Sequence, residues 1–232
     1  MILTNTVKSV SFKDIAENIR ADLGLVDKDL NESYAALSKK YDLPTEMLSA
    51  KAKESHRALY DAYTKELTRI SAELDAVDTK NSVRKYHELK WEEIFNINAV
   101  YLHELYFANI SDMQSEIGMD SLAYMRLTRD FGTFDKWQFD FVASAQGVSN
   151  GWAVCAYSTY LRRFINFYVD SHNNNIPVGC YPVIVLDMWE HAYFKDYMTD
   201  KKAYIYSMMK ELNWTVIEER FKRADKIGAA LR

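Results

Sequence analysis

The first half of the chain has the hydrophobic periodicity of helices. Apolar residues recur at three- and four-residue intervals over residues 11–23, and a second short helical pattern covers residues 31–41. A longer pattern without glycine or proline runs over residues 45–77, and another follows over residues 83–108. A short polar link, residues 78–81, joins the two long patterns. We therefore predict an antiparallel helical hairpin.

The second half combines short helices with β-rich runs. β-branched and aromatic residues gather in residues 152–157, 164–169 and 183–186, which predicts three short strands. Helical patterns flank these runs, over residues 120–129, 134–145, 201–212 and 214–227, with one more beginning at Met188.

This order of elements predicts an α+β fold. It consists of an N-terminal antiparallel helical hairpin followed by a mixed α/β domain with a small three-stranded antiparallel sheet. We expect a helical extension over residues 1–44, a hairpin domain over residues 45–118 and an α/β C-terminal domain over residues 119–232.

Composition narrows the class of protein. Only 7 glycines and 3 prolines occur in 232 residues, which favours helix over an all-β fold. Lysine and arginine total 29 against 33 acidic residues, so we expect no nucleic-acid partner. The longest aliphatic run, residues 183–186, is too short for a membrane span, and the first residues do not resemble a signal peptide. Two cysteines indicate a reducing compartment, such as the cytoplasm, and leave metal binding to histidines and carboxylates.

One candidate pair of metal ligands follows the last β-rich run. Asp187 stands where this run ends, and His191 lies four residues further on, so both side chains can converge on one point. A carboxylate with an imidazole suits iron, manganese or zinc. Taken alone, this spacing is more typical of a solvated helix face.

The residues around this pair resemble a known family. Residues 185–194 read Val-Leu-Asp-Met-Trp-Glu-His-Ala-Tyr-Phe, which is similar to the Asp-x-Trp-Glu-His-Ala-Tyr signature of iron/manganese superoxide dismutases. Residues 131–136, 149–152 and 213–221 resemble further segments of that family, in the same order. The resemblance covers roughly residues 48–221 and is strongest in the second half. It identifies the chain as a divergent member.

The resemblance implies one iron or manganese ion per subunit, without choosing between the two metals. Residues 98–107 are similar to the family's Asn-His-x-x-x-Trp region, and residues 48–56 resemble the stretch that leads into its first ligand. The implied ligands are His56, His103, Asp187 and His191.

The two remaining histidines are assigned no role in metal binding. His87 is 16 residues from His103, about 24 Å along a helix, so the two cannot share one metal. His172 stands in an asparagine-rich loop and is predicted to be solvated.

Functional groups beyond the ligands depart from the family pattern. The family's gateway tyrosine falls on Thr64, and the nearby Tyr63 and Tyr60 are candidates to replace it. We assign Tyr63 a catalytic role, together with Trp189 as a cavity-lining residue.

The family's hydrogen-bonding glutamine also has no direct counterpart. It falls on Ala99 or on Val148, depending on which of two family positions is used. Gln146 is the nearest candidate, and we assign it this catalytic role, which requires a rearrangement of the loop over residues 145–150.

Two functions follow from these comparisons with the family pattern. The first is a homodimeric superoxide dismutase that converts superoxide to oxygen and hydrogen peroxide, with Tyr60, Glu190 and Tyr193 at the dimer interface. The second is a structural subunit of a larger assembly, such as a mitochondrial ribosome or a virion, with weak or no activity. The departures at Thr64, Ala99 and Val148 favour the second, and the complete ligand set favours the first. A mitochondrial or particle-associated location belongs to the second function.

Overall fold

The computed structural model describes residues 34–110 and 115–231. The helix predicted over residues 11–23 lies outside these residues, as does most of the predicted extension. No helix in the described ranges is both long enough and apolar enough to cross a membrane.

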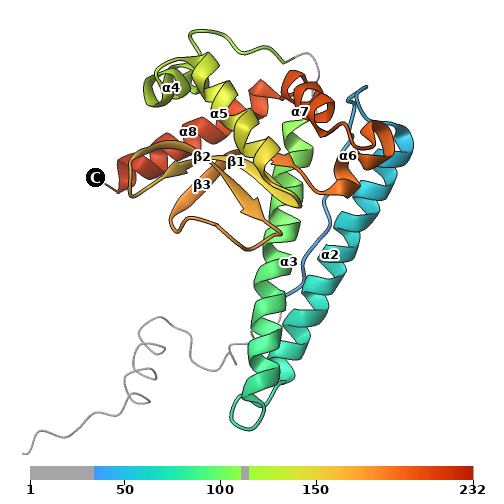
Figure 1. Ribbon diagram of the computed structural model, residues 1–232. Coiled ribbons are helices and arrows are strands. Elements are labelled where there is room, and N and C mark those ends of the chain that lie inside the picture. Colours follow the sequence, from blue (N-terminus) through green and yellow to red (C-terminus); the bar gives the residue numbers. More distant parts are fainter. Residues whose placement is uncertain (1–33, 111–114, 232) are drawn as a thin grey trace, which may run out of the picture.

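A long antiparallel hairpin forms the first half of the structure (Figure 1). It consists of α2 (Ala50–Ala76) and α3 (Val83–Asn109). The helix α2 begins five residues later than its periodicity suggests, because the hydroxyl of Ser49 caps it by accepting a hydrogen bond from the amide of Ala52 at 3.2 Å. The hairpin prediction is confirmed.

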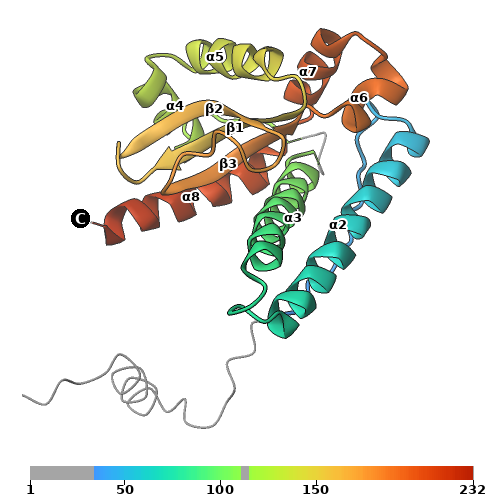
Figure 2. The same ribbon diagram turned by 60° about the horizontal axis from the view of Figure 1, so that its bottom comes forward.

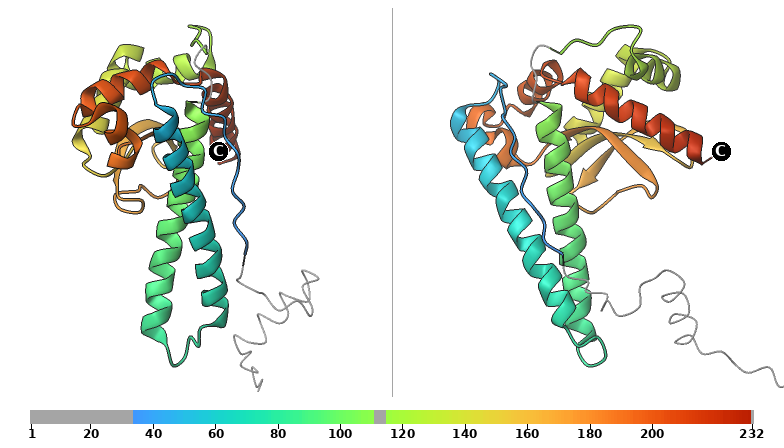
Figure 3. Two further views of the ribbon diagram at one scale, coloured as in Figure 1. Left: turned by 90° about the vertical axis from the view of Figure 1, so that its right-hand side faces the viewer. Right: turned by 180° about the vertical axis from the view of Figure 1, so that it is seen from behind.

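Residues 34–48 form an extended strap along the hairpin, which Figure 3 shows in blue beside the two helices. The amide of Ala36 donates to Thr68 Oγ1 at 3.1 Å, and the amide of Lys39 donates to Tyr60 Oη at 3.0 Å. These tertiary hydrogen bonds replace the helical ones that periodicity suggested. The prediction of a helix over residues 31–41 is therefore wrong for the described part of that range.

The second half contains the predicted three-stranded antiparallel sheet. Its strand order is β2-β1-β3, so β1 is central and buried along its whole length. Figure 2 shows α5 on one side of the sheet and α8 on the other; α5 packs on β1 and β2, whereas α3 and α8 pack on β3. The elements are α4 (Leu122–Phe131), α5 (Phe134–Gly147), β1 (Gly151–Ser158), β2 (Arg163–Asp170), β3 (Cys180–Asp187), α6 (Glu190–Tyr197), α7 (Lys201–Lys210) and α8 (Trp214–Ala230).

One main core spans both halves of the described structure. It contains Leu67 and Leu105 from the hairpin together with Trp152 and Ile184 from the sheet. A smaller cluster of Ile70, Leu74 and Leu89 stabilises the far end of the hairpin. The α+β fold class is confirmed, with a shared core that holds the end of β3 against the two long helices.

The start of β1 requires glycine because two strands approach closely there. A Cβ on Gly151 would lie 1.9 Å from the carbonyl oxygen of Val169 on β2, which no real contact tolerates. The carbonyl of Gly151 also accepts the amide of Met188 at 2.8 Å, and Trp152 is paired in register with Asp187. This glycine therefore fixes the strand end on which Asp187 stands.

We expect Gly151→Ala to lower the free energy of unfolding by about 3 kcal/mol or more, because the backbone of β1 must move away from β2. Urea denaturation measures this loss. Gly147→Ala is the matched control, since no atom beyond its chain neighbours and the backbone of its own helix lies within 4 Å of the added Cβ, and we expect a change within about 1 kcal/mol. Equal stability of the two variants would contradict the close approach.

Candidate metal centre

Four potential ligands from four different elements meet at one point. His56 lies on α2, His103 on α3, Asp187 at the end of β3 and His191 in the first turn of α6. One ligand atom from each lies within 4.8 Å of all the others. His56, His103 and Asp187 are buried, and His191 is half-buried.

Asp187 stands at the centre of this cluster. Its Oδ2 atom lies 3.1 Å from His56 Nε2, 3.2 Å from His191 Nε2 and 3.7 Å from His103 Nε2. Its Oδ1 atom accepts the amide of Trp189 at 2.9 Å, which fixes the orientation of the carboxylate. Three imidazole nitrogens thus face one carboxylate oxygen.

The protonation states of these buried groups suit metal binding. Burial lowers the pKa of His56, and it lowers the pKa of His103 to about 3. Burial alone would raise the pKa of Asp187, but attraction and hydrogen bonding from His191 and His56 outweigh it and keep that pKa below its usual value. Neutral imidazoles beside an ionised carboxylate are the forms that bind a metal ion.

His103 provides the test of whether a metal fits here. Its Nδ1 atom donates to the carbonyl oxygen of Ala99 at 2.6 Å, which leaves Nε2 as an unprotonated acceptor. Within the described part of the chain, this buried Nε2 has no hydrogen-bond partner. A buried acceptor without a partner is costly unless a ligand satisfies it. The nitrogen and carboxylate donors fit an iron or manganese ion.

His172 belongs to the same site, so the prediction that it is solvated is wrong. Its side chain is fully buried; Nδ1 accepts from Trp152 Nε1 at 3.0 Å, and Nε2 lies 3.2 Å from Tyr63 Oη. The loop folds back because the amide of Ser171 donates to the carbonyl of Asn150 at 2.9 Å. Burial lowers the pKa of His172 to about 4, so the ring is neutral.

The hydrogen bonds of His172 determine its tautomer. Since Nδ1 accepts the proton of the Trp152 indole, Nε2 carries the ring proton and donates to Tyr63 Oη. In the sequence, the one indication that His172 lies near the site is its place just after β2, the strand that pairs with the strand of Trp152.

Of the two candidates for the gateway tyrosine, Tyr63 is the one whose hydroxyl reaches His172. Its ring lies 5.5 Å from the ring of His103, and its hydroxyl contacts His172. Thr64, at the family position, is buried and donates its hydroxyl to the carbonyl of Tyr60 at 3.0 Å. The hydroxyl of Thr64 is therefore directed to its own helix, and Tyr63, the preceding residue on α2, supplies the hydroxyl at the site.

Tyr60 does not meet the expectation that it lies at a dimer interface. Its side chain is only 1% exposed, and its hydroxyl donates to Glu104 Oε1 at 2.9 Å. Its ring packs against Tyr41 and Phe107. Tyr60 is enclosed by its own chain because it occupies the inner face of the hairpin.

The structure does not bring Gln146 to the ligand cluster. The helix α5 continues to Gly147, so Gln146 stands in its last turn with an exposed side chain. Ala99 and Val148 are both buried and apolar, and His172 is the hydrogen-bonding side chain beside the cluster. The loop rearrangement that Gln146 required does not occur.

The remaining predicted residues surround His191. Trp189 is half-buried and stacks on His172, with ring centroids 5.0 Å apart and planes at 27°. Glu190 is exposed, and Tyr193 is 8% exposed. Trp189 therefore forms one wall of the site, and Glu190 faces outward.

Known proteins are similar to this chain in amino-acid sequence. Residues 121–220 match the family described as "Iron/manganese superoxide dismutases, C-terminal domain". The superoxide dismutase [Fe] of Aquifex pyrophilus is 32% identical over 182 residues, which cover 77% of this chain and 84% of that protein. The superoxide dismutase [Fe] of Cupriavidus metallidurans is 33% identical over 168 residues, 71% of this chain and 83% of that protein.

A manganese relative is also similar. The superoxide dismutase [Mn] of Nocardia asteroides is 30% identical over 138 residues, 59% of this chain and 66% of that protein. Together with the three-histidine, one-aspartate cluster, these similarities confirm the predicted relationship: the chain belongs to the iron/manganese superoxide dismutase family.

Proposed function

We propose that this protein is a superoxide dismutase that uses one iron or manganese ion per subunit, held by His56, His103, Asp187 and His191. The observation that carries the proposal is the convergence of four ligand atoms within 4.8 Å, one of them the buried and unpartnered Nε2 of His103. The relatives described above, all of them named superoxide dismutases, support the activity. The alternative of a purely structural subunit gains no support from them.

Each protein group has a defined task in this reaction. The bound ion would supply one-electron chemistry, so that one superoxide is oxidised to oxygen and a second, with two protons, is reduced to hydrogen peroxide. The ionised carboxylate of Asp187 offsets the charge of the cation, and its bond from the Trp189 amide holds it in place. Ala99 orients His103 through the bond at Nδ1.

We assign Tyr63 and His172 to the handling of the substrate and its protons. His172 donates to Tyr63 Oη, so the hydroxyl proton of Tyr63 stays free to donate to an anion in the cavity. Burial raises the pKa of Tyr63, with Asp187 adding to the effect, so the hydroxyl is protonated at neutral pH. Trp189 excludes water from the same wall by stacking on His172 and His191.

We further propose a homodimer that uses Glu190 at its interface; Tyr193, the other residue that matches the family's interface, is only 8% exposed. The exposure of Glu190 next to His191 supports this assignment. Sedimentation velocity should give the mass of two chains, and a single-chain mass at micromolar concentration would exclude the dimer.

The proposed activity is tested by following superoxide and its products directly. We expect the metal-loaded protein to consume superoxide catalytically and to release oxygen and hydrogen peroxide in equal amounts. Protein stripped of metal by a chelator serves as the control and should lose the activity. Stoichiometric iron or manganese without dismutation would contradict the enzymatic function while leaving the fold intact.

A further inference from the structure

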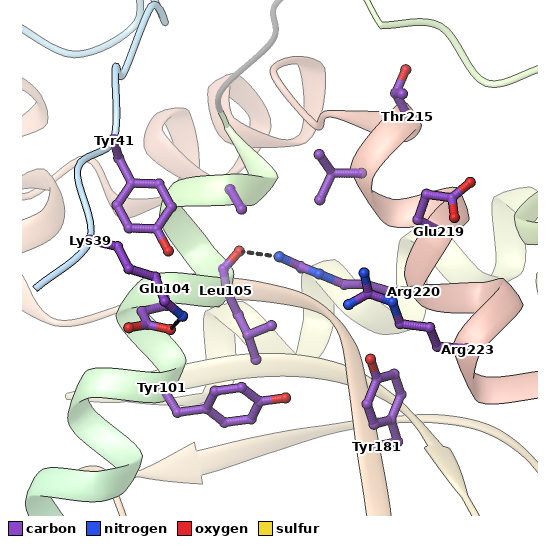
Figure 4. A pocket seen from close by; sticks show the side chains of 12 residues that line it. Lys39, Tyr41, Tyr101, Glu104, Leu105, Tyr181, Thr215, Glu219, Arg220 and Arg223 are labelled. Atoms are coloured by element: carbon purple, nitrogen blue, oxygen red, sulfur yellow. Dashed lines mark hydrogen bonds and ion pairs between the residues drawn. The ribbon is translucent and has the colours of Figure 1, made fainter. Parts of the chain in front are cut away.

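A cavity of about 430 Å³ lies apart from the metal centre, since none of the four proposed metal ligands lines it. It lies between the strap, α3, β3 and α8, and Figure 4 shows it from close by. Tyr101 from α3 and Tyr181 from β3 point into it, and Arg220 and Arg223 from α8 form its opposite side. Nothing in the proposed dismutase reaction uses this cavity.

Arg220 places a buried positive charge at the base of the cavity. Its side chain donates to the side-chain oxygen of Asn109, and to the carbonyls of Val183 and Leu105 at 3.1 Å each. All three acceptors are neutral, and within the described residues this guanidinium forms no ion pair with a carboxylate. Burial lowers the pKa of Arg220 to about 10, as expected for a cation that lacks a compensating anion.

Arg223 adds a second cation at the mouth of the cavity. It is exposed and interacts electrostatically with Glu219, but among the described residues its guanidinium forms no close ion pair with a carboxylate. The two acidic side chains of the lining are already paired, Glu219 with Lys222 at 2.7 Å and Glu104 with Lys39. Each of these carboxylates therefore has a lysine as its ion-pair partner, and the lining itself carries three basic side chains, Lys39, Arg220 and Arg223, against two acidic ones.

Four hydroxyl side chains also line the cavity, those of Tyr41, Tyr101, Tyr181 and Thr215. Figure 4 shows the hydroxyl of Tyr101 directed across the cavity toward Tyr181, and that of Tyr181 directed toward Arg223. Leu105 and Val216 contribute an apolar wall beside them. A few convergent polar groups next to an apolar surface are typical of small-molecule sites of this size.

We propose that this cavity binds a small organic anion. Its phosphate or carboxylate headgroup would contact the guanidinium of Arg223 and the hydroxyls of Tyr101 and Tyr181, and its apolar part would lie against Leu105 and Val216. A guanidinium binds either headgroup through charge-assisted hydrogen bonds, and tyrosine hydroxyls add neutral ones. Arg220 contributes mainly through its charge, because neutral oxygens occupy three of its five N–H donors.

Isothermal titration calorimetry on the metal-loaded protein tests this proposal with four probes. We expect phenyl phosphate or benzoate to bind with a stoichiometry of one per chain, and the tighter of the two identifies the headgroup. Inorganic phosphate should bind more weakly because it lacks the apolar part, and benzyl alcohol should not bind because it lacks the charge. Absence of saturable binding by both organic anions overturns the proposal.

Substitutions inside and outside the cavity test whether the anion binds there. Arg223→Gln should weaken binding about tenfold or more, and Tyr181→Phe about two- to tenfold. Lys226→Gln removes the same charge from α8 outside the cavity, so its dissociation constant should stay within twofold. Equal losses in Arg223→Gln and Lys226→Gln, or full binding by Arg223→Gln, would overturn the proposal. Because the readout is binding, a failure here is distinct from a failure of dismutation.

Discussion

Asp187→Asn is expected to give a folded protein that retains no iron or manganese and no dismutase activity. The amide has the same shape, and its oxygen can still accept the backbone amide of Trp189. It carries no negative charge, however, and three neutral imidazoles alone hold a hard trivalent cation poorly. The side-chain amide of the variant would also donate toward His56 and His191, whose Nε2 atoms lie 3.1 and 3.2 Å from Asp187 Oδ2.

Inductively coupled plasma mass spectrometry after metal loading measures this effect, with circular dichroism as the check on folding. Asp225→Asn is the matched control, because it removes a carboxylate that pairs with Arg126 on the surface at 2.6 Å. The control should keep one metal per chain and full activity. A metal-loaded and active Asp187→Asn protein would exclude Asp187 as a ligand.

Changes at the Tyr63–His172 hydrogen bond should lower activity while the metal stays in place. We expect Tyr63→Phe and His172→Ala each to reduce the rate of superoxide consumption by about 10- to 100-fold, the usual effect of removing a group that supports a metal site. His172→Gln should lose less, since its side-chain oxygen can accept from Trp152 and its amide can donate to Tyr63.

The double variant decides whether the two residues act through one hydrogen bond. If they do, Tyr63→Phe combined with His172→Ala should lose no more activity than the more damaging single change. His87→Gln, on the exposed side of α3, is the control for histidine replacement and should behave like the unmodified protein. Full activity in Tyr63→Phe, or loss of metal in His172→Ala, would contradict the assigned roles.

The parts of the site that lie close together in sequence were predictable. Asp187 and His191 share one strand end and one helical turn, so their convergence follows from local geometry. The hairpin follows from periodicity and from a link of a few polar residues. His56 and His103 required the family resemblance, because nothing local to either residue indicates a partner on the other helix.

The parts that depend on tertiary contacts were not predictable. His172 is buried because the carbonyl of Asn150 accepts a hydrogen bond from the loop at Ser171, and because the indole of Trp152 donates to its ring. Both contacts join segments about 20 residues apart. The strap is extended because hydroxyls on α2 accept its amides. Gln146 does not reach the metal centre because α5 continues one residue past it. The end of a helix is the feature that a periodic pattern predicts least well.

The most direct test of the central claim is anomalous X-ray scattering from crystals of the metal-loaded protein, recorded on both sides of the iron and manganese absorption edges. The four-ligand arrangement predicts one strong peak per chain, in contact with Nε2 of His56, His103 and His191 and with a carboxylate oxygen of Asp187. The edge at which the peak appears identifies the metal. A stoichiometric metal located elsewhere, or no peak between these four side chains, would contradict the assignment.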